Sequence, residues 1–573
     1  MKQEWRVYSK KADFTAIEDK FGIDRVVARI IRNRDVEGFD TIERYLYAGI
    51  DSMYDPSLMK DMQKAADILL ECIKNKRKIR IIGDYDIDGI CSIYILFKGL
   101  LSLGADVDYE VPDRIADGYG INENLIKKAH DSGRDVILTC DNGIAAIEQI
   151  AYAKSLGMTV VVTDHHEVRY TQENGEKCYI IPKADAVVDP KQNDCTYPFD
   201  ALCGAGVAYK LIQCLYSKEK LPDSRLYEFI EYAAIATIGD VVDLKDENRI
   251  LVKEGLKRLR NTTNYGLNAL IELNGIEKSD IQAYHVGFII GPCLNASGRL
   301  DTAKRAIKML ITDDKAEAQR LAGDLKALND ERKNLTAKAV ETACMIAENS
   351  LSEDKVLVIY IPECHESIAG IVAGKIREKY YKPVIVLTKG DEYVKGSARS
   401  IEGYNIFEKL LECEELLVKF GGHPMAAGMS LTEDNIEKLR KKLNENANLS
   451  EEDLTEKIWI DVPMPLYYIN EKVIKDLECL EPFGKGNEKP VFADKNLTIM
   501  SLTSIGKNEQ FTKMTLKDTQ GCMMEALAFM ESECFKDAFL NKKSISCTYY
   551  PQINEFHGNK KLQICITGYK IDK

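Results

Sequence analysis

Several classes of protein are excluded by what this sequence lacks. None of its 16 cysteines belongs to a C-x-x-C pair, so neither a zinc ribbon nor a disulfide framework is indicated. No stretch reaches the roughly 18 to 20 apolar residues of a membrane-spanning helix. Residues 1–4 do not begin a signal peptide. We therefore expect a cytoplasmic protein without membrane contact, whose cysteines are reduced and mostly buried.

An excess of positive charge is also missing. The 573 residues contain 78 Lys and Arg against 91 Asp and Glu, a formal net charge of -13. Because proteins that bind nucleic acids usually carry a basic surface, composition alone argues against a nucleic-acid enzyme. A metal-binding carboxylate cluster and solvated acidic helices, as at residues 412–415 and 451–453, account for part of this charge. Phosphate binding would then depend on a few local Arg and Lys side chains.

Three closely spaced carboxylates are the strongest signal that the sequence does contain. Residues 83–89 read G-D-Y-D-I-D-G and place Asp84, Asp86 and Asp88 at every second position after an apolar run. Carboxylates crowded at a strand end repel one another strongly, so we expect hard divalent cations among them. Taken alone, the segment could also be an ordinary Asp-rich loop or a single calcium-binding loop.

The same pattern, an apolar run followed by ligand-type side chains, recurs along the chain. The runs and the residues after them are 136–138 with Asp141 and Asn142, 160–162 with Asp164, His165 and His166, and 233–238 with Asp240. Short β-rich runs that alternate with helical stretches predict a parallel α/β sheet, and ligands bind outside the carboxyl ends of such strands. We therefore expect all of these clusters to meet at one crevice.

The mixture of donors indicates which metal this crevice would hold. Carboxylates together with imidazoles suit manganese or magnesium better than structural zinc, which favours thiolates in a closed tetrahedron. Two ions are the natural number for so many ligands. Each piece also has a simpler interpretation, since N-G is a turn signal and both histidines could be structural. Their joint occurrence in this order favours the metal site.

These segments resemble the four signature motifs of the DHH phosphoesterases. The flanking sequence resembles, more specifically, the RecJ family of bacterial single-strand-specific exonucleases. The matching stretches are residues 111–120 (VPDRIADGYG), 291–300 (GPCLNASGRL), 396–400 (GSARS), 421–428 (GGHPMAAG) and 482–487 (PFGKGN). The resemblance extends from about residue 79 to residue 573.

The resemblance implies a 5′-to-3′ exonuclease that hydrolyses single-stranded DNA with two divalent ions, Mn2+ or Mg2+, in DNA repair and recombination. The metal ligands that follow from the motifs are Asp86, Asp88, Asp141, His165 and Asp240. Asp84 would bind or orient a ligand, and Asp164 would hold an imidazole in the correct tautomer. His166 is either a further ligand or a group that polarises the phosphate, and the sequence leaves both roles open.

An exonuclease must also recognise the end of a strand. Forked Arg donors, hydroxyls and backbone amides suit a terminal 5′ phosphate. The candidates in the matching motifs are Arg114, Arg299, Ser397 and Arg399, with Gly422 and His423 as further phosphate contacts. Tyr119 could stack on a base or be an ordinary exposed tyrosine. His423 could instead be a core histidine in a tight turn.

Two positions depart from the family pattern. Cys293 replaces the Arg that is usual in G-P-R-x-N-A, which should remove one charge from the substrate groove. Residues 363–366 read E-C-H-E where relatives commonly have Trp-His and a small residue. This second departure puts a stacking role for the segment around His365 in doubt.

The fold class that we predict is α/β with additional domains, in agreement with the length of the chain. A parallel-sheet DHH domain is joined by a long helix to a smaller α/β DHH-associated domain, and an all-β domain follows. The segments are a helical region at 1–75, the DHH domain at 76–300, the connecting helix at 301–350, the DHH-associated domain at 351–450 and the last domain at 458–573. The resemblance implies an oligonucleotide-binding (OB) barrel there, which sequence patterns alone do not distinguish from a sandwich.

Two other functions are compatible with the same motifs. One is a phosphodiesterase that acts on short oligonucleotides or cyclic dinucleotides, which would not need so long a chain or residues 482–487. The other is a non-catalytic scaffold, which would have no need for a full set of metal ligands. The exonuclease function further implies single-strand-binding protein and a RecQ-type helicase as partners, beside single-stranded DNA with a 5′ end.

Overall fold

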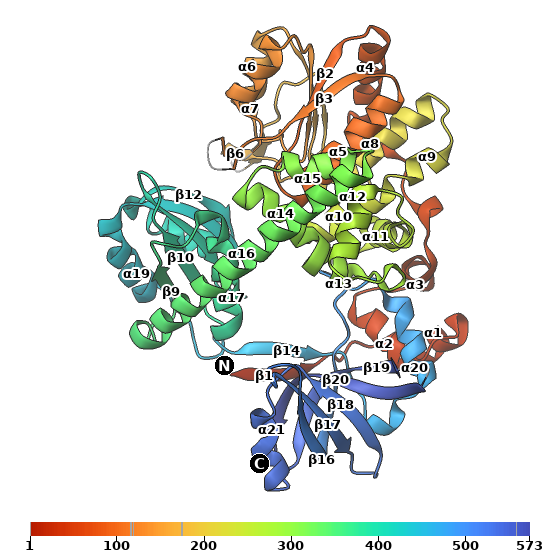
Figure 1. The fold of residues 1–573 in the computed structure, drawn as a ribbon, viewed down its shortest axis with the longest axis vertical. Helices are drawn as coiled ribbons and strands as arrows, with labels where there is room; N and C mark the ends of the chain where they lie inside the picture. Colours follow the sequence, from red (N-terminus) through yellow and green to blue (C-terminus); the bar gives the residue numbers. More distant parts are fainter. Residues whose placement is uncertain (1, 115–116, 119, 174–175, 557–558, 573) are drawn as a thin grey trace. The chain divides into compact units, whose positions relative to one another are not determined.

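The computed structural model describes residues 2–114, 117–118, 120–173, 176–556 and 559–572 (Figure 1). The chain forms two compact units, each assembled from separate parts of the sequence. Unit 1 contains Met1–Glu4, Tyr54–Val242 and Glu254–Glu456, and unit 2 contains Trp5–Met53, Asp243–Lys253 and Lys457–Lys573. The N-terminal region predicted over residues 1–75 is thus divided between the units at Tyr54.

A parallel sheet of five strands organises the first part of unit 1, as the sequence predicts. Its order is β3 (Asp106–Glu110), β2 (Lys78–Ile82), β4 (Val136–Cys140), β5 (Thr159–Thr163) and β8 (Ala186–Val188), and every neighbouring pair is parallel. The strand order reverses between β2 and β4, the kind of position where ligands bind in open parallel sheets. The loops that follow β2 and β4 carry Asp84 and Asp141.

Helices cover both faces of this sheet (Figure 1). On one face lie α6 (Glu123–Asp131) and α7 (Ile147–Ser155), and on the other lie α4 (Met62–Lys74), α5 (Ile87–Ser102) and α8 (Gly204–Lys218). The antiparallel pair β6 (Tyr170–Glu173) and β7 (Glu176–Tyr179) forms a separate small hairpin. Burial on both faces explains why β4, β5 and β8 read as nearly continuous apolar runs, whereas the edge strand β3 carries Asp and Glu.

The apolar run at residues 233–238 is helical, so the prediction that Asp240 ends a strand is wrong. The run lies in α10 (Ile230–Gly239), and Asp240 is the residue that follows this helix. Three alanines in the run favour helix over strand. The helices that follow are α11 (Asp246–Leu259), α12 (Tyr265–Leu273), α13 (Ala283–His285), the π-helix η4 (Val286–Ile290), α14 (Gly291–Leu300) and α15 (Lys304–Ile311).

The predicted connecting helix is present as α16 (Lys315–Ser350), which is 36 residues long. It begins later than residue 301, because α15 occupies residues 304–311 and the chain then breaks its helical path. Asp314 fixes the new start, since its side chain accepts hydrogen bonds from the amides of Ala316 and Glu317.

The second α/β part of unit 1 is a five-stranded mixed sheet with the order β12, β13, β11, β10, β9. The strands are β9 (Leu357–Tyr360), β10 (Val384–Thr388), β11 (Val394–Arg399), β12 (Leu417–His423) and β13 (Ala426–Leu431). Alternate residues of β10 face opposite cores. Val384 and Val386 pack with α16 and α17 (Glu366–Tyr380), whereas Ile385 and Leu387 pack on the side of α18 (Ile406–Leu411) and α19 (Ile436–Glu445).

Unit 2 contains a β-barrel, as the family resemblance implies. Its strands are β16 (Phe492–Ile505), β17 (Phe511–Lys517), β18 (Met523–Ala528), β19 (Ile545–Phe556) and β20 (Asn559–Ile571). Because β16 pairs with both β17 and β19, the sheet closes on itself. The barrel shares one hydrophobic core with α1 (Phe14–Phe21), α2 (Arg25–Asn33), α3 (Phe39–Tyr47) and α20 (Glu471–Leu477).

A buried ion pair joins the N-terminal and C-terminal parts of unit 2, and its removal should destabilise that unit. Arg34 Nη1 lies 2.7 Å from Asp461 Oδ1, with the side chains 9% and 4% exposed. We expect Asp461→Ala to lower the free energy of unfolding by about 3 to 5 kcal/mol, because it leaves a buried guanidinium without its carboxylate. Trp5 and Trp459 both belong to unit 2, so tryptophan fluorescence during urea unfolding measures this change.

The matched control is Glu533→Ala. Glu533 of unit 2 pairs with Lys536 but its side chain is 73% exposed, so its loss should cost less than about 1 kcal/mol. Equal destabilisation by the two substitutions would contradict the prediction.

Candidate metal centre and phosphate site

The loop between β2 and α5 is held by its own carboxylates. Asp86 caps α5, and its Oδ1 accepts hydrogen bonds from the amides of Asp88 at 3.0 Å and Gly89 at 3.1 Å. Asn295 of α14 accepts from the amide of Ile87 at 2.8 Å. Aspartate is favoured at a helix N-cap because it satisfies free amides and complements the positive end of the helix. The loop therefore has a fixed conformation.

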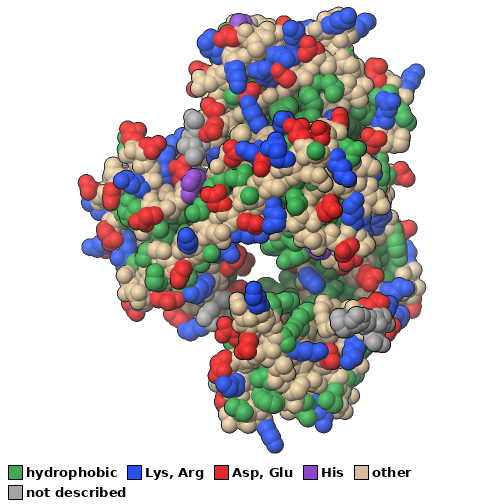
Figure 2. All heavy atoms as spheres, in the orientation of Figure 1, with side chains coloured by type: hydrophobic (Ala, Val, Ile, Leu, Met, Phe, Trp, Pro, Cys, Tyr) green, Lys and Arg blue, Asp and Glu red, His purple; other side chains and the backbone are tan. Residues whose placement is uncertain are grey.

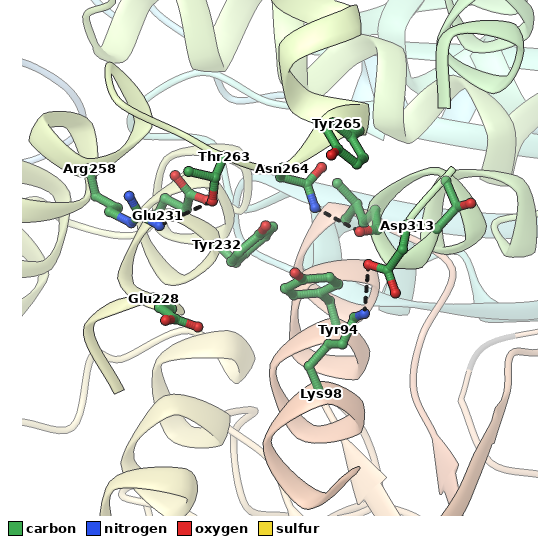
Figure 3. A pocket seen from close by; sticks show the side chains of 12 residues that line it. Tyr94, Lys98, Glu228, Glu231, Tyr232, Arg258, Thr263, Asn264, Tyr265 and Asp313 are labelled. Carbon is green, nitrogen blue, oxygen red and sulfur yellow. Dashed lines mark hydrogen bonds and ion pairs between the residues drawn. The ribbon is translucent and has the colours of Figure 1, made fainter. Parts of the chain in front are cut away.

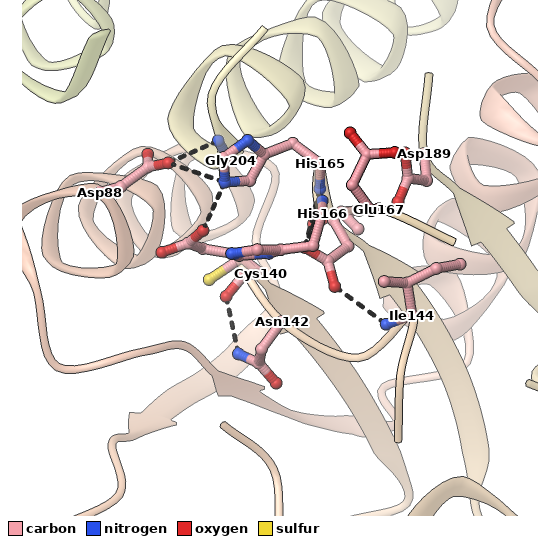
Figure 4. Close-up of polar contacts among 12 residues, drawn as sticks. Asp88, Cys140, Asn142, Ile144, His165, His166, Glu167, Asp189 and Gly204 are labelled. Carbon is pink, nitrogen blue, oxygen red and sulfur yellow. Dashed lines mark hydrogen bonds and ion pairs between the residues drawn. The ribbon is translucent and has the colours of Figure 1, made fainter. Parts of the chain in front are cut away.

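Asp88, the second residue of α5, is fully buried against the start of another helix, α8. Its two carboxylate oxygens accept hydrogen bonds from the amides of Gly204 at 2.6 Å and Ala205 at 2.7 Å, at the start of α8 (Figure 4). A Cβ on Gly204 would lie 2.7 Å from the Cβ of Asp141. Glycine at this position thus allows α8 to begin directly beside two carboxylates.

His165 lies among the carboxylates that the sequence predicted around it. Its Nε2 is 3.0 Å from Asp141 Oδ1, 3.5 Å from Asp88 Oδ2 and 3.9 Å from Asp240 Oδ2. Burial and the charge of His166 lower the pKa of His165, so a neutral imidazole is available as a ligand. Asp141 has a left-handed backbone with φ of 59°, which aspartate tolerates.

The turn after Asp240 is conformationally strained. Val241 has the same φ of 59°, which is exceptional for a β-branched residue and costs roughly 1 to 3 kcal/mol. Strain of this kind persists only where the surroundings impose it. The strained residue, Val241, directly follows Asp240, through which the end of α10 contributes to the acidic cluster.

Asp164 lies behind the two histidines. Its Oδ1 is 2.7 Å from Nδ1 of His166 and accepts from the amide of His165 at 2.7 Å, while Oδ2 accepts from the amide of Ile144 at 2.9 Å (Figure 4). Burial alone would lower the pKa of His166, but its hydrogen bond to Asp164 and the charges of Asp164, Asp88 and Asp240 together outweigh this and raise the pKa to about 9. The His166 side chain is 44% exposed, against 9% for His165.

Three overlapping groups have ligand atoms close enough together to hold a metal ion. They are Asp141 with His165 and His166, Asp88 with His165 and Asp240, and Asp84 with Asp86 and Asp141, each with its ligand atoms within 4.8 Å of one another. The structure therefore brings together every metal ligand predicted from the sequence.

The electrostatics of the cluster fit divalent cations. Burial and the charge of Asp86 raise the pKa of Asp84 to about 8 and that of Asp88 to about 6, and burial and Asp88 raise the pKa of Asp240 to about 7. Oδ1 of Asp84 is buried and accepts no hydrogen bond from the described residues. Carboxylate oxygens and imidazoles without thiolates match manganese or magnesium.

Asp189 is a further acidic residue at the site that the sequence analysis missed. It is fully buried directly after β8, and burial together with the charge of Asp164 raises its pKa to about 8 (Figure 4). The amide of Lys191 donates to its Oδ1 at 2.8 Å. The signal was available, because the apolar run at residues 186–188 precedes Asp189 in the same way as the other clusters.

Arg114 and Arg299 lie beside the metal loop. The guanidinium carbon of Arg114 is 4.8 Å from the ring centre of Tyr85. Arg299 Nη1 donates to the carbonyl of Ser367 at 2.6 Å. Burial and the charges of Arg114 and Arg332 lower the pKa of Arg299 to about 10. No ion pair joins Arg299 to a carboxylate among the described residues, so this positive group can receive an anion.

Ser397 and Arg399 contact the same helix that Arg299 reaches. A Cβ on Gly370 of α17 would lie 3.1 Å from Arg399 Nη2 and 3.5 Å from Ser397 Oγ. Arg399 pairs in register with Ala426, which pairs with His423 on the next strand. The motifs on α14, α17 and β11 are therefore brought together in unit 1.

The glycine-rich segment forms the end of the hairpin of β12 and β13. Gly422 has a φ of 157°, and a Cβ there would lie 2.4 Å from the carbonyl oxygen of Ala426. His423 is exposed, so the alternative of a core histidine is wrong. Tyr119 lies outside the described residues.

The two departures from the family pattern have structural explanations. Cys293 is fully buried, and Asn329 Nδ2 lies 3.3 Å from its Sγ, so it does not line an open groove. Arg332, three residues after Asn329 on α16, adds a positive charge near Arg299 that the sequence analysis missed. His365 is the N-cap of α17 and accepts from the amide of Ser367, which is a structural role.

A separate cavity of about 240 Å³ lies at the other ends of α5 and α10 (Figure 3). Its lining includes Tyr94 and Lys98 of α5, Tyr232 of α10, and Tyr265 of α12. None of the predicted site residues lines it, so this cavity is distinct from the metal cluster.

Comparison with known proteins identifies the parts of the chain. The family models that match are the DHH family N-terminal domain at residues 78–238, the DHHA1 domain at 353–448 and the RecJ OB domain at 460–568. A Bacillus subtilis protein named single-stranded-DNA-specific exonuclease RecJ is 37% identical over 99% of this chain and 70% of its own length. Its namesake in Haemophilus influenzae is 33% identical over 94% of this chain and 95% of its own length.

Solved structures give the same result. The crystal structure of RecJ in complex with Mn2+ from Thermus thermophilus matches with a TM-score of 0.84 and 28% identity, covering 100% of this chain and 80% of that chain. The corresponding complex with Mg2+ matches with a TM-score of 0.79 and 27% identity, covering 100% and 79%. Among the residues described, no helix has the length and apolar character needed to cross a bilayer.

Divalent ions should stabilise unit 1 through the acidic cluster. We expect Mn2+ to raise the melting temperature of the protein by a few degrees relative to EDTA, because it binds the folded state and relieves carboxylate repulsion. The rise should be larger at pH 8 than at pH 6, since the carboxyls with raised pKa hold protons that compete with the ion at the lower pH. Differential scanning calorimetry measures both effects.

Asp141→Asn should lose most of this stabilisation, whereas Asp434→Asn, in the exposed 3-10 helix Glu433–Asn435, should keep it. An equal response of the wild type and Asp141→Asn to Mn2+ would contradict the assignment.

Proposed function

The chain belongs to the RecJ family of single-stranded-DNA-specific exonucleases, and we propose that it removes nucleotides from the 5′ end of single-stranded DNA in repair and recombination. The observation that carries this proposal is the gathering of a full set of acidic and imidazole donors beside partly buried arginines that lack a carboxylate partner among the described residues. The first group suits metal ions and the second a phosphate.

Asp86, Asp88, Asp141, His165 and Asp240 are the proposed ligands of two divalent ions, manganese or magnesium. Asp84 completes the set, since its buried Oδ1 has no donor among the described residues. Bound ions of this kind activate a water molecule for attack on phosphorus and neutralise charge on the phosphate.

His166 is proposed to polarise the phosphate rather than to bind a metal ion. Asp164 contacts its Nδ1 at 2.7 Å and fixes the orientation of the ring, so Nε2 is the nitrogen proposed to contact a phosphate oxygen. The side chain is more exposed than that of His165, which favours contact with a substrate. Asp164 thus acts as a positioning residue for both histidines.

The terminal 5′ phosphate is proposed to bind Arg114, Arg299, Ser397 and Arg399, with His423 and the backbone of Gly422 nearby. Arg299 and Arg399 are partly buried and lack ion-pair partners among the described residues, and forked guanidinium donors match phosphate oxygens. Such a site selects strand ends because an internal phosphodiester carries less charge and fewer free oxygens.

The alternative substrates are short oligonucleotides or cyclic dinucleotides. The closed barrel of unit 2 favours long single strands, because OB barrels commonly bind oligonucleotides. Action in the cytoplasm, together with single-strand-binding protein and a RecQ-type helicase, belongs to the same proposal and follows from the family resemblance alone.

The decisive assay uses a 3′-labelled, 5′-phosphorylated single strand of about 40 nucleotides with Mn2+, beside the corresponding duplex and a dinucleotide. We expect loss of nucleotides from the 5′ end of the single strand only, abolished in Asp141→Ala and retained in Asp434→Ala. Cleavage of the dinucleotide alone would indicate the small-substrate function. Absence of metal-dependent cleavage of any substrate would indicate a scaffold.

The phosphate site predicts a preference for phosphorylated ends. We expect the wild type to degrade a 5′-phosphorylated strand faster than the same strand with a 5′ hydroxyl. Arg399→Ala should reduce this ratio about tenfold, because a charge-assisted hydrogen bond is lost. Initial rates on the two strands measure the ratio.

Arg320→Ala is the matched control, since Arg320 is 59% exposed on α16. If Arg399→Ala slowed both strands equally and left the ratio unchanged, the residue would not contact the terminal phosphate.

A further inference from the structure

Two large aromatic side chains are exposed on unit 1 just before α14. Tyr284 is 60% exposed and Phe288 is 68% exposed. Their rings stack on one another with centroids 5.0 Å apart and planes at 26°. The same short segment buries Val286 and Ile290 completely, so it is anchored on one side and presents two rings on the other.

This arrangement is unusual for a surface that only faces water. Single exposed apolar residues are common, but adjacent ones mark binding surfaces more often. The segment between Tyr284 and Phe288 enters a π-helix over Val286–Ile290, a rare conformation that occurs frequently at functional sites. Val241, which follows Asp240 and is 57% exposed, is another apolar residue held in a strained conformation in the same unit.

The aromatic segment packs directly on the helix ends that carry the acidic cluster. A Cβ on Gly287 would lie 3.4 Å from Cγ2 of Ile238, two residues before Asp240. A Cβ on Gly291 would lie 3.0 Å from Cδ1 of Ile87, which stands between Asp86 and Asp88. The two rings are thus fixed to the same elements as the proposed metal ligands.

Helix α14 connects the rings to the phosphate site and passes the metal loop between them. Asn295 accepts from the amide of Ile87 at 2.8 Å, and Arg299 lies near the C-terminal end of the helix. At about 1.5 Å per residue, Phe288 and Arg299 are roughly 17 Å apart along this helical run. A strand whose 5′ phosphate binds Arg299 would cross the metal loop and then extend toward the rings.

We propose that Tyr284 and Phe288 form a base-stacking platform for single-stranded DNA on the 3′ side of the scissile phosphate. The proposal rests on the proposed exonuclease function. Aromatic faces stack on any base, so such a platform holds the strand without selecting a sequence. It also explains why the rings stay exposed: the outer faces of the pair are covered only when nucleotides are bound.

The test compares a long and a short substrate with the double variant Tyr284→Ala/Phe288→Ala in the full chain. We expect the KM for a 40-nucleotide strand to rise about tenfold with little change in kcat. Cleavage of a 5′-phosphorylated dinucleotide should not change, because it is too short to reach the rings. Tyr284→Phe keeps an aromatic face and should behave as the wild type.

Tyr265→Ala is the matched control. Tyr265 is also exposed, at 45%, but lines the cavity at the other ends of α5 and α10 (Figure 3). Binding of a fluorescein-labelled single strand in EDTA, followed by anisotropy, gives a measurement that does not depend on cleavage. The double variant should bind about tenfold more weakly there, while its melting temperature stays that of the wild type.

The outcomes separate this proposal from the proposed function. An inactive wild type that binds single strands through the two rings would refute the exonuclease and, with it, the placement beside a scissile phosphate, while the stacking of the rings on single strands would stand. An active wild type with an unchanged KM and affinity in the double variant would refute the platform alone. A change of oligomeric state in the double variant, with an unchanged KM, would show that a second copy of the chain covers the rings and would also overturn it.

Discussion

Repulsion among buried carboxylates is the constraint on which the organisation of unit 1 depends. Burial raises the pKa of Asp84, Asp88, Asp141 and Asp240, so the cluster opposes its own assembly when all of them are charged. The fold supplies partial compensation from backbone amides at the starts of α5 and α8, where helix dipoles place positive charge. The amides offset only part of the repulsion between the carboxylates. Divalent cations relieve the rest when they bind, which makes their binding more favourable.

Short sequence patterns predicted those residues of the centre whose positions follow from one strand and the turn after it. The turns after β2, β4 and β5 combine apolar strands with Asp, Asn and His, and they meet because parallel strands end at one edge. Asp240 was assigned to the right cluster but to the wrong kind of element, because an apolar run of this length fits a buried helix as well as a strand. Arg332 was missed because its relation to Arg299 depends on how α16 packs against α14, which no short pattern encodes.

The net charge of the whole chain does not describe the charge near the proposed phosphate site. The chain has a net charge of -13, and on the face shown in Figure 2 basic and acidic side chains are interspersed without a large field of one sign. The arginines proposed to bind phosphate are few and partly buried, as Arg299 and Arg399 are. A partly buried guanidinium without a carboxylate partner interacts more strongly with an anion than an exposed one does, because solvent screens it less. Composition alone thus argued against the nuclease family to which the chain belongs.

The interleaving of the two units along the chain determines the order in which the protein is completed on the ribosome. Apolar residues of α2, such as Ile30 and Ile31, are buried in a core that α1 and α3 share with residues from Val462 onward. At 5 to 20 residues per second, synthesis of the intervening chain takes about 20 to 90 s. During that time unit 1 can fold while the N-terminal helices wait with an uncovered apolar face. A nascent chain of this protein therefore needs protection for α1 to α3 until the barrel of unit 2 emerges.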